Sequence, residues 1–131
     1  MMKIGFYVSG NPIGKERPRK GKYGNFYTPQ KTHLAEERIW LYFWIAATEW
    51  TTRNSGKKSV LPSIQKSKKV RVDIKCFFVT KRHADLDNIQ KLVWDALGDC
   101  QGERLGDDKR FYGSIDFEYR HEPGLQITVT W

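Results

Sequence analysis

Apolar residues recur at every second position in several short segments, a period that is typical of half-buried β-strands. Near the N-terminus the apolar positions are Ile4, Phe6 and Val8. The longest alternation runs from Val70 to Phe78 and predicts the clearest strand of the chain. A further alternation covers Leu125 to Trp131. These patterns predict a β-sheet that is buried on one face.

The last two expected strands are neighbours in the sequence. One strand is expected near 113–119, and the turn residues 121–124 connect it to the alternation that ends at Trp131. A short turn between two strands favours an antiparallel pair. We therefore expect the chain to close with a β-hairpin.

Two segments carry helical patterns. One helix is expected from about Gln30 to Trp50, and its second half, around Ile39–Ile45, is apolar on every side. A helix of this kind is buried all round, so a partner subunit is expected to cover part of it. A second helix is expected over Asp87–Asp99. Its apolar residues recur at helical spacing and form one face: Ile89, Leu92, Val93, Ala96 and Leu97.

The order of these elements predicts the class of fold. Strand, basic loop, long helix, linker, strand, helix, strand and strand together indicate an α+β protein. We expect a single domain over residues 1–131, a mixed β-sheet with two main helices packed against it. Residues 51–69 are rich in Ser, Gly and Lys and are expected to form a basic flexible linker within this domain. This linker is either a solvated loop or an arm that contacts DNA.

Charge and composition narrow the choice of partner. The chain has 23 Lys and Arg residues against 15 Asp and Glu residues, a net charge of +8. A small basic domain favours nucleic acid, although basic charge can also serve solubility alone. Cys76 and Cys100 belong to no zinc or disulfide motif, and the apolar stretch 39–47 is too short to span a bilayer. We expect a soluble, intracellular protein with no membrane contact and no organic cofactor.

Acidic residues at one junction between elements carry the candidate chemistry. Asp85 and Asp87 lie where the expected strand gives way to the second helix, and such a pair of carboxylates can converge on Mg²⁺. Lys91, one helical turn beyond Asp87, adds a positive charge that can neutralise the carboxylates or stabilise a phosphate. Asp107 and Asp108 offer a third carboxylate for a metal site that hydrolyses phosphodiesters. The alternative is that the pair only caps a helix or a turn.

Longer motifs stand in a fixed order along the chain. Residues 10–19 read GNPIGKERPR, and residues 85–91 read DLDNIQK. Asp95-Ala96-Leu97 and then Asp107-Asp108 follow them. The ordered set resembles the RusA family of Holliday junction resolvases, whose patterns are G-x-P-x-x-K-x-R-P-R and D-x-D-N-x-x-K. The similarity covers nearly the whole chain.

The resemblance implies an activity and a set of residues. It implies a homodimeric, Mg²⁺-dependent crossover junction endodeoxyribonuclease that cuts four-way DNA junctions by paired symmetric nicks, in recombination and repair. The implied metal ligands are Asp85, Asp87 and Asp108, with Asp107 as the alternative third acid and Lys91 as the catalytic lysine. A bacterial or phage-encoded enzyme of this kind is expected to work in the cytoplasm.

Basic residues around the two motifs are the candidate DNA contacts. They are Lys15, Arg17, Arg19, Lys20 and Arg82. Two other functions stay open. One is a non-catalytic nucleic-acid-binding module, and the other is a nuclease that acts on flaps or forks. A Mg²⁺-dependent nicking assay on several DNA structures separates these alternatives.

Overall fold

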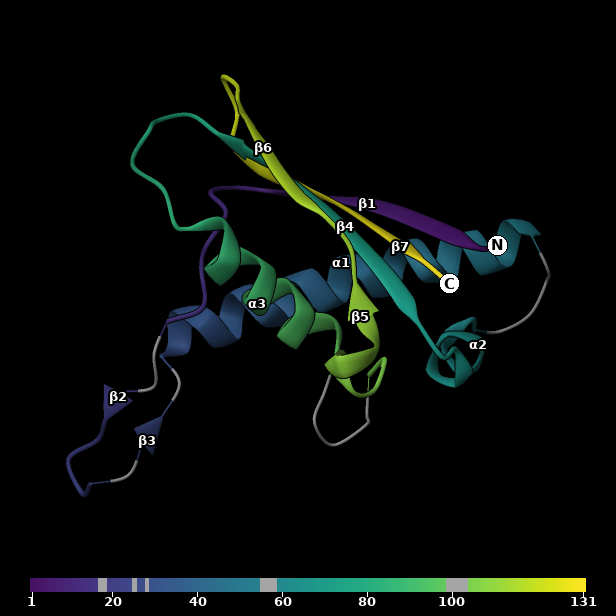
Figure 1. The fold of residues 1–131 in the computed structure, drawn as a ribbon, viewed down its shortest axis with the longest axis horizontal. Coiled ribbons are helices and arrows are strands. Elements are labelled where there is room, and N and C mark those ends of the chain that lie inside the picture. Colours follow the sequence, from purple (N-terminus) through teal and green to yellow (C-terminus); the bar gives the residue numbers. More distant parts are fainter. Residues whose placement is uncertain (17–18, 25, 28, 55–58, 99–103) are drawn as a thin grey trace.

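The computed structural model describes residues 1–16, 19–24, 26–27, 29–54, 59–98 and 104–131, with the backbone alone for 19, 26, 27 and 108. Its fold is α+β, as expected, with five strands in one mixed sheet and a separate two-stranded sheet (Figure 1). The elements in chain order are β1 (Lys3–Ser9), β2 (Arg19–Lys20), β3 (Phe26–Tyr27), α1 (Gln30–Asn54), α2 (Leu61–Lys66), β4 (Val70–Phe78), α3 (Leu86–Leu97), the 3-10 helix η1 (Asp108–Arg110), β5 (Phe111–Tyr112), β6 (Ile115–Tyr119) and β7 (Gly124–Thr130).

The larger sheet is built around β7 and β4. Strand β7 is antiparallel to both β1 and β4, so that Ile127 lies opposite Phe6 on one side and Ile74 on the other. Strands β5 and β6 both run parallel to β4 along its second edge. Between them Gly113 approaches Val72 so closely that a Cβ atom would lie 2.1 Å from the Val72 carbonyl oxygen. Glycine is therefore required where the chain passes from β5 to β6.

The expected hairpin at the end of the chain is wrong, because β4 lies between β6 and β7. Phe78 is paired with Tyr119 of β6, whereas Phe77 is paired with Gly124 of β7. The backbone N–H of Arg120 donates a hydrogen bond to the Phe78 carbonyl at 2.9 Å. The turn after β6 therefore crosses from one side of β4 to the other (Figure 1). The alternation of apolar residues predicts a strand but does not predict which strand it pairs with.

The hydrophobic core lies between the sheet and the two main helices. The inward residues of β1, β4 and β7 alternate as predicted, and α3 buries the face predicted for it: Ile89, Leu92, Val93, Ala96 and Leu97. Each buried aliphatic side chain stabilises the fold by about 1.5–3 kcal/mol relative to exposure. Cys76 lies in this core, and burial raises the pKa of its thiol to about 12.

Helix α1 is longer than predicted and is not buried on every side. Its buried positions form one line along the helix: Thr32, Ile39, Phe43, Ala47 and Thr51. Leu41, Trp44 and Ile45 are 52%, 43% and 47% exposed. The chain therefore covers one face of α1 and leaves an apolar face accessible. Within the described ranges no helix combines the length and the apolarity needed to cross a membrane.

The linker expected over 51–69 is wrong for most of its length. Helix α1 continues to Asn54, and α2 forms over Leu61–Lys66. Ile64 is fully buried and Val60 nearly so, which ties α2 to the core. Val60, Leu61 and Ile64 thus anchor a segment whose other residues are mostly polar. Residues 55–58 lie outside the described residues.

Candidate functional site

Asp85 and Asp87 lie at the start of α3, and a loop that begins after Phe78 connects this point to β4 (Figure 1). Asp85 occupies the N-cap position, but its side chain makes no capping hydrogen bond, and only its carbonyl accepts from the Ile89 N–H at 3.1 Å. Asp87 lies in the first turn of the helix. Both residues are exposed. The helix-capping explanation for Asp85 therefore lacks its hydrogen bond, and the carboxylate is free to bind a ligand.

Lys91 follows Asp87 by one turn and is also exposed. Within the described part of the chain no ion pair joins it to Asp87. The expected neutralisation of the acids by Lys91 is therefore not formed as a direct contact. Its ammonium group stays available to an anion that approaches the start of α3.

The other two candidate acids lie at the opposite end of α3. The N–H of Leu105 donates to the Leu97 carbonyl at 3.0 Å, which holds the segment before Asp107 against the end of the helix. Asp107 accepts a hydrogen bond from the Lys109 N–H at 3.0 Å and so caps η1. Asp108 begins η1, and its side chain lies outside the described residues. These residues adjoin the end of α3 that is farther from the loop leaving β4 (Figure 1).

The length of α3 sets the scale of the separation between the two groups of acids. A helix of 12 residues is about 18 Å long, and Asp85 and Asp107 flank α3 at its two ends. Among the described residues, no group of three or more His, Cys, Asp or Glu side chains is placed to hold a metal. One chain therefore brings Asp85 and Asp87 together but does not add Asp107 to them.

The N-terminal motif forms one wall of a groove beside Asp85. The backbone N–H of Lys15 donates to the Asn88 carbonyl at 2.9 Å. A Cβ atom on Gly14 would lie 2.9 Å from Asn88 Cβ and 3.0 Å from Ala84 Cβ, so glycine is needed for this close approach. The groove has a volume of about 480 Å³ and runs between residues 11–16 and the start of α3. The two sequence motifs, residues 10–19 and 85–91, thus meet at one place in the fold.

Lys15 has a role that the sequence did not predict. Its Nζ lies 3.0 Å from Glu36 of α1 and 2.8 Å from Asp95 of α3. Burial alone would lower its pKa, but the hydrogen bonds and charges of Asp95 and Glu36 outweigh burial and raise the pKa. Lys15 joins the two main helices in this structure. A phosphate would have to compete with both carboxylates for it.

The remaining basic candidates differ in what the structure describes of them. Lys20 and Arg82 are exposed, and Arg82 stands in the loop that precedes Asp85. Arg17 lies outside the described residues, and for Arg19 only the backbone in β2 is described. Lys20 and Arg82 are therefore accessible to a polyanion, and the expected contacts of Arg17 and Arg19 stay predictions.

An aromatic cluster beside the acids was missed by sequence reasoning. His83 is exposed, and its ring stacks on Phe78 with centroids 3.7 Å apart and planes at 3°. Phe117 and Tyr119 of β6 lie next to this stack. The alternation of Phe117 and Tyr119 is visible in the sequence. Their position beside His83 depends on β6 pairing with β4, which the sequence pattern did not predict.

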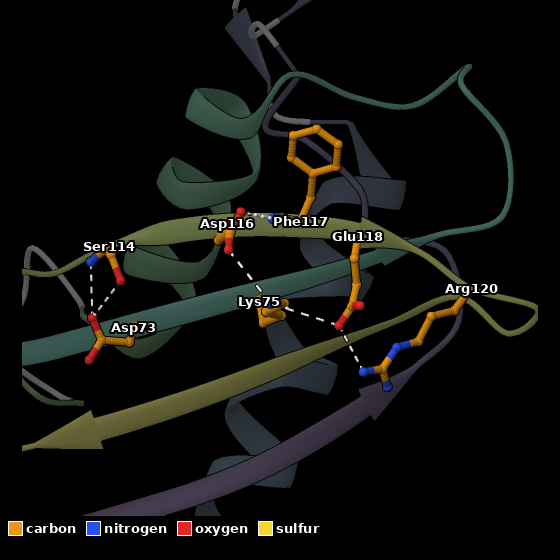
Figure 2. A network of polar contacts seen from close by, with 7 residues as sticks. All are labelled: Asp73, Lys75, Ser114, Asp116, Phe117, Glu118 and Arg120. Carbon is orange, nitrogen blue, oxygen red and sulfur yellow. Dashed lines mark hydrogen bonds and ion pairs between the residues drawn. The ribbon is translucent and has the colours of Figure 1, made fainter.

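The opposite face of the sheet carries charges that neutralise one another. Lys75 of β4 lies between Asp116 and Glu118 of β6, at 3.6 and 3.7 Å, and Arg120 binds Glu118 at 2.7 Å. Figure 2 shows these side chains on the side of the strands away from Phe117. Cations that are already paired with carboxylates attract a polyanion weakly. The candidate site lies on the other side of the sheet.

Fold and site together define a class of protein: a small basic α+β domain with exposed paired carboxylates at a helix start. Residues 9–130 match the family described as "Endodeoxyribonuclease RusA". The chain therefore belongs to the RusA endodeoxyribonuclease family, a family of DNA nucleases that resolve Holliday junctions. The match spans both motifs and nearly the whole chain. No curated protein matches the chain.

Proposed function

We propose that this protein is a Mg²⁺-dependent endonuclease that resolves four-way DNA junctions by paired symmetric nicks, in recombination and repair within a bacterial cell. The observation that carries the proposal is the exposed pair Asp85 and Asp87 at the start of α3, with Asp85 free of a capping hydrogen bond. Family membership supports nuclease chemistry on DNA junctions. The dependence on Mg²⁺ and the cutting in symmetric pairs are proposed in addition to what the exposed acids and the family match support.

The donor set suits Mg²⁺. Asp85 and Asp87 present oxygen atoms from two exposed side chains that are one residue apart, and Mg²⁺ prefers such ligands while keeping several waters. When bound, Mg²⁺ lowers the pKa of a coordinated water and offsets charge on the scissile phosphate. Lys91 would stabilise negative charge that develops on the phosphate. Lys20 and Arg82 would bind flanking phosphates and hold the strand in register.

The position of the third acid supports a homodimer. Asp107 and Asp108 follow the far end of α3, a helix about 18 Å long whose other end carries Asp85. We propose that Asp108 of the partner subunit completes the site, since Asp107 already caps η1. A two-fold dimer would then hold two equivalent sites, which is what two matched cuts in a nearly two-fold symmetric junction require.

Mixed dimers test whether the site is shared. Asp85→Asn and Asp108→Asn homodimers should both be inactive. If each site takes Asp108 from the other subunit, a heterodimer of the two variants has one site with both changes and one intact site. It should therefore nick one strand of the junction. If all ligands come from one chain, both sites carry a change and the heterodimer stays inactive.

A panel of DNA structures tests the activity itself. We expect Mg²⁺-dependent nicking of a four-way junction, much weaker cutting of a flap or fork, and none of a linear duplex. Equal cutting of flaps and junctions would instead assign a general structure-specific nuclease. Binding to every substrate without nicking, in the presence of Mg²⁺, would assign a non-catalytic module. The Asp85→Asn variant serves as the control for contaminating nucleases.

A further inference from the structure

Four aromatic side chains form a cluster at the end of β4, which we call the aromatic platform: Phe78, His83, Phe117 and Tyr119. Phe78 is buried at 2% exposure and supports the His83 ring, which lies parallel to it. The Phe117 centroid lies 5.9 Å from both of these rings. The Tyr119 centroid lies 6.4 Å from Phe78 and 6.0 Å from His83. Phe117 and Tyr119 therefore flank the stack rather than covering it.

The His83 ring is fixed in place by hydrogen bonds at both nitrogens. Its Nδ1 lies 2.9 Å from the Ala84 carbonyl oxygen, and its Nε2 lies 3.3 Å from the Tyr119 hydroxyl. A carbonyl only accepts, so Nδ1 carries the hydrogen, and in the neutral ring Nε2 accepts from Tyr119. One ring face rests on Phe78, yet His83 is exposed. With one face on Phe78 and both nitrogens hydrogen-bonded, the ring face opposite Phe78 is the one that a stacking ligand would use.

The platform keeps more aromatic surface accessible than a packing role needs. Phe117 is 40% exposed and Tyr119 is 48% exposed. Figure 2 shows Phe117 pointing away from the paired charges around Lys75. Exposed aromatic surface costs free energy, and in nucleic-acid-binding proteins such surface stacks with bases.

The surroundings of the platform suit a nucleic acid strand. His83 lines the same groove as Asp85 and precedes it by two residues. Lys81 and Arg82 are exposed in the same loop and offer positive charge to phosphates on either side of a base. A nucleotide that stacked on His83 would thus have its backbone close to the proposed metal ligands.

We propose that the aromatic platform receives an unstacked nucleobase from the branch point of the junction, next to the phosphate that is cut. This proposal rests on the proposed function and adds a contact that selects branched DNA. Bases at a branch point lose part of their stacking, so they are the least costly to displace. The platform offers them a new stacking partner, whereas bases within a linear duplex would have to unpair first.

Binding measurements without divalent metal test the contact separately from cleavage. Phe117→Leu and His83→Leu should each weaken junction binding by about 5- to 100-fold, the range expected for the loss of one base–aromatic stack. His83→Phe keeps a flat ring over Phe78 and removes both hydrogen bonds, so it should bind like the parent. Tyr7→Leu is the matched control, because Tyr7 is 43% exposed and lies beside Phe77 on the opposite face of the sheet, with ring centroids 6.2 Å apart.

A double-mutant cycle with the DNA separates stacking from damage to the fold. Junctions that lack one base at the branch point are prepared, one position at a time. When the missing base is the one that would stack on the platform, the parent protein should bind the abasic junction more weakly than the intact junction. The Leu variants already lack the stacking contact, so they should bind both junctions equally. If the Leu variants weaken binding to all junctions by the same factor, including every abasic one, the platform contacts no base and the proposal is overturned.

These measurements also distinguish failure of the proposed nuclease function from failure of the platform proposal. Failure of the proposed function would be seen in the parent protein, as absence of junction nicking with Mg²⁺. Failure of the platform would be seen when the parent nicks junctions normally and the His83→Leu and Phe117→Leu variants bind and cut like it. Thermal unfolding of each variant shows whether it is folded at the temperature of the assay.

Discussion

At the scale of single residues, Lys15 shows how a charged side chain in a basic motif can belong to the framework. Its ammonium group contacts Glu36 and Asp95, which belong to α1 and α3. Its side chain is 28% exposed and that of Glu36 is 15% exposed. Removing the cation would leave partly buried carboxylates without a partner, and such groups are costly. Lys15 therefore positions the N-terminal motif beside the acids.

Replacing Lys15 by Met should lower the free energy of unfolding by about 1–3 kcal/mol. Because the pKa of Lys15 is raised in the folded state, its contribution is complete below the ordinary value of 10.5 and is lost as the pH rises beyond it. Chemical denaturation of parent and variant at neutral and alkaline pH measures both effects.

Lys20 offers the matched control for this change, because it is exposed and belongs to the same basic segment. Lys20→Ala should leave stability unchanged and reduce the slope of log affinity against log salt by about 1. If Lys15→Met instead reduced the salt slope and left stability intact, Lys15 would be a phosphate contact as the sequence suggested.

Asp85 and Asp87 are expected to act in chemistry and not in folding. Asp85→Asn or Asp87→Asn removes a charged ligand and keeps the side-chain shape, so junction cleavage should fall by orders of magnitude. Binding without metal should be kept or should tighten, because one charge that repels phosphate is lost. Nicking rates and metal-free affinities measure this. Variants that nick at the parent rate with lower stability would show that the acids support the helix instead.

At the scale of elements, the edge of the sheet depends on one aspartate. Asp73 of β4 accepts hydrogen bonds from the N–H and the hydroxyl of Ser114, at 3.0 and 2.9 Å (Figure 2). It also pairs with Arg71 at 2.8 Å. Burial alone would raise its pKa, but the hydrogen bonds from Ser114 and the contact with Arg71 lower it overall. These contacts hold the chain where it passes from β5 to β6.

Ser114→Ala should therefore loosen the start of β6, with a loss of stability of about 1 kcal/mol. Since the folded pKa of Asp73 is lowered, its contribution is present above the ordinary value of 3.8 and disappears as the pH falls below it. Hydrogen exchange of the β6 amides near neutral pH should rise in the variant. The parent should approach the variant's stability only in acid.

The elements also show which parts of the fold could be predicted from the sequence alone. The strands β1, β4 and β7 and the helix α3 were predicted because their apolar residues repeat at a local period. The DxD pair was correctly placed at the strand-to-helix junction for the same reason. The insertion of β4 between β6 and β7 was not predicted, since it depends on pairs such as Phe78 with Tyr119 that are distant in the sequence. The separation of Asp107 from Asp85 was not predicted either: the sequence predicted the helix between them, but not that the segment before Asp107 is held at the far end of that helix by the hydrogen bond from Leu105 to Leu97.

At the scale of the whole molecule, the apolar face of α1 predicts a partner. Leu41, Trp44 and Ile45 are exposed, and Trp40 and Trp44 lie in ring contact with centroids 6.3 Å apart. Sedimentation at micromolar concentration should give a mass of about twice 15.4 kDa. Trp44→Glu should shift the protein to monomer and remove paired nicking. Glu49→Lys, a charge change on an exposed position of the same helix, should leave the dimer intact.

A monomeric parent protein with full activity would contradict this expectation. A monomeric Trp44→Glu variant that still makes paired nicks would equally show that assembly is not needed for catalysis. Circular dichroism of the variant separates loss of the dimer from loss of the fold.

The pairing of β1 with β7 has a consequence for how the protein is made. Lys3 is paired with Thr130, and among the strands that the structure describes β7 is the one that pairs with β1. While the ribosome is still translating, β1 has no strand to join until residues 124–130 have emerged. Until then the nascent chain exposes the apolar sides of β1 and β4, so the sheet should form only after residues 124–130 are available, and pairing between strands so distant in sequence should be slow. A ribosome stalled before residue 124 should leave a chain that proteases digest readily and that chaperones bind.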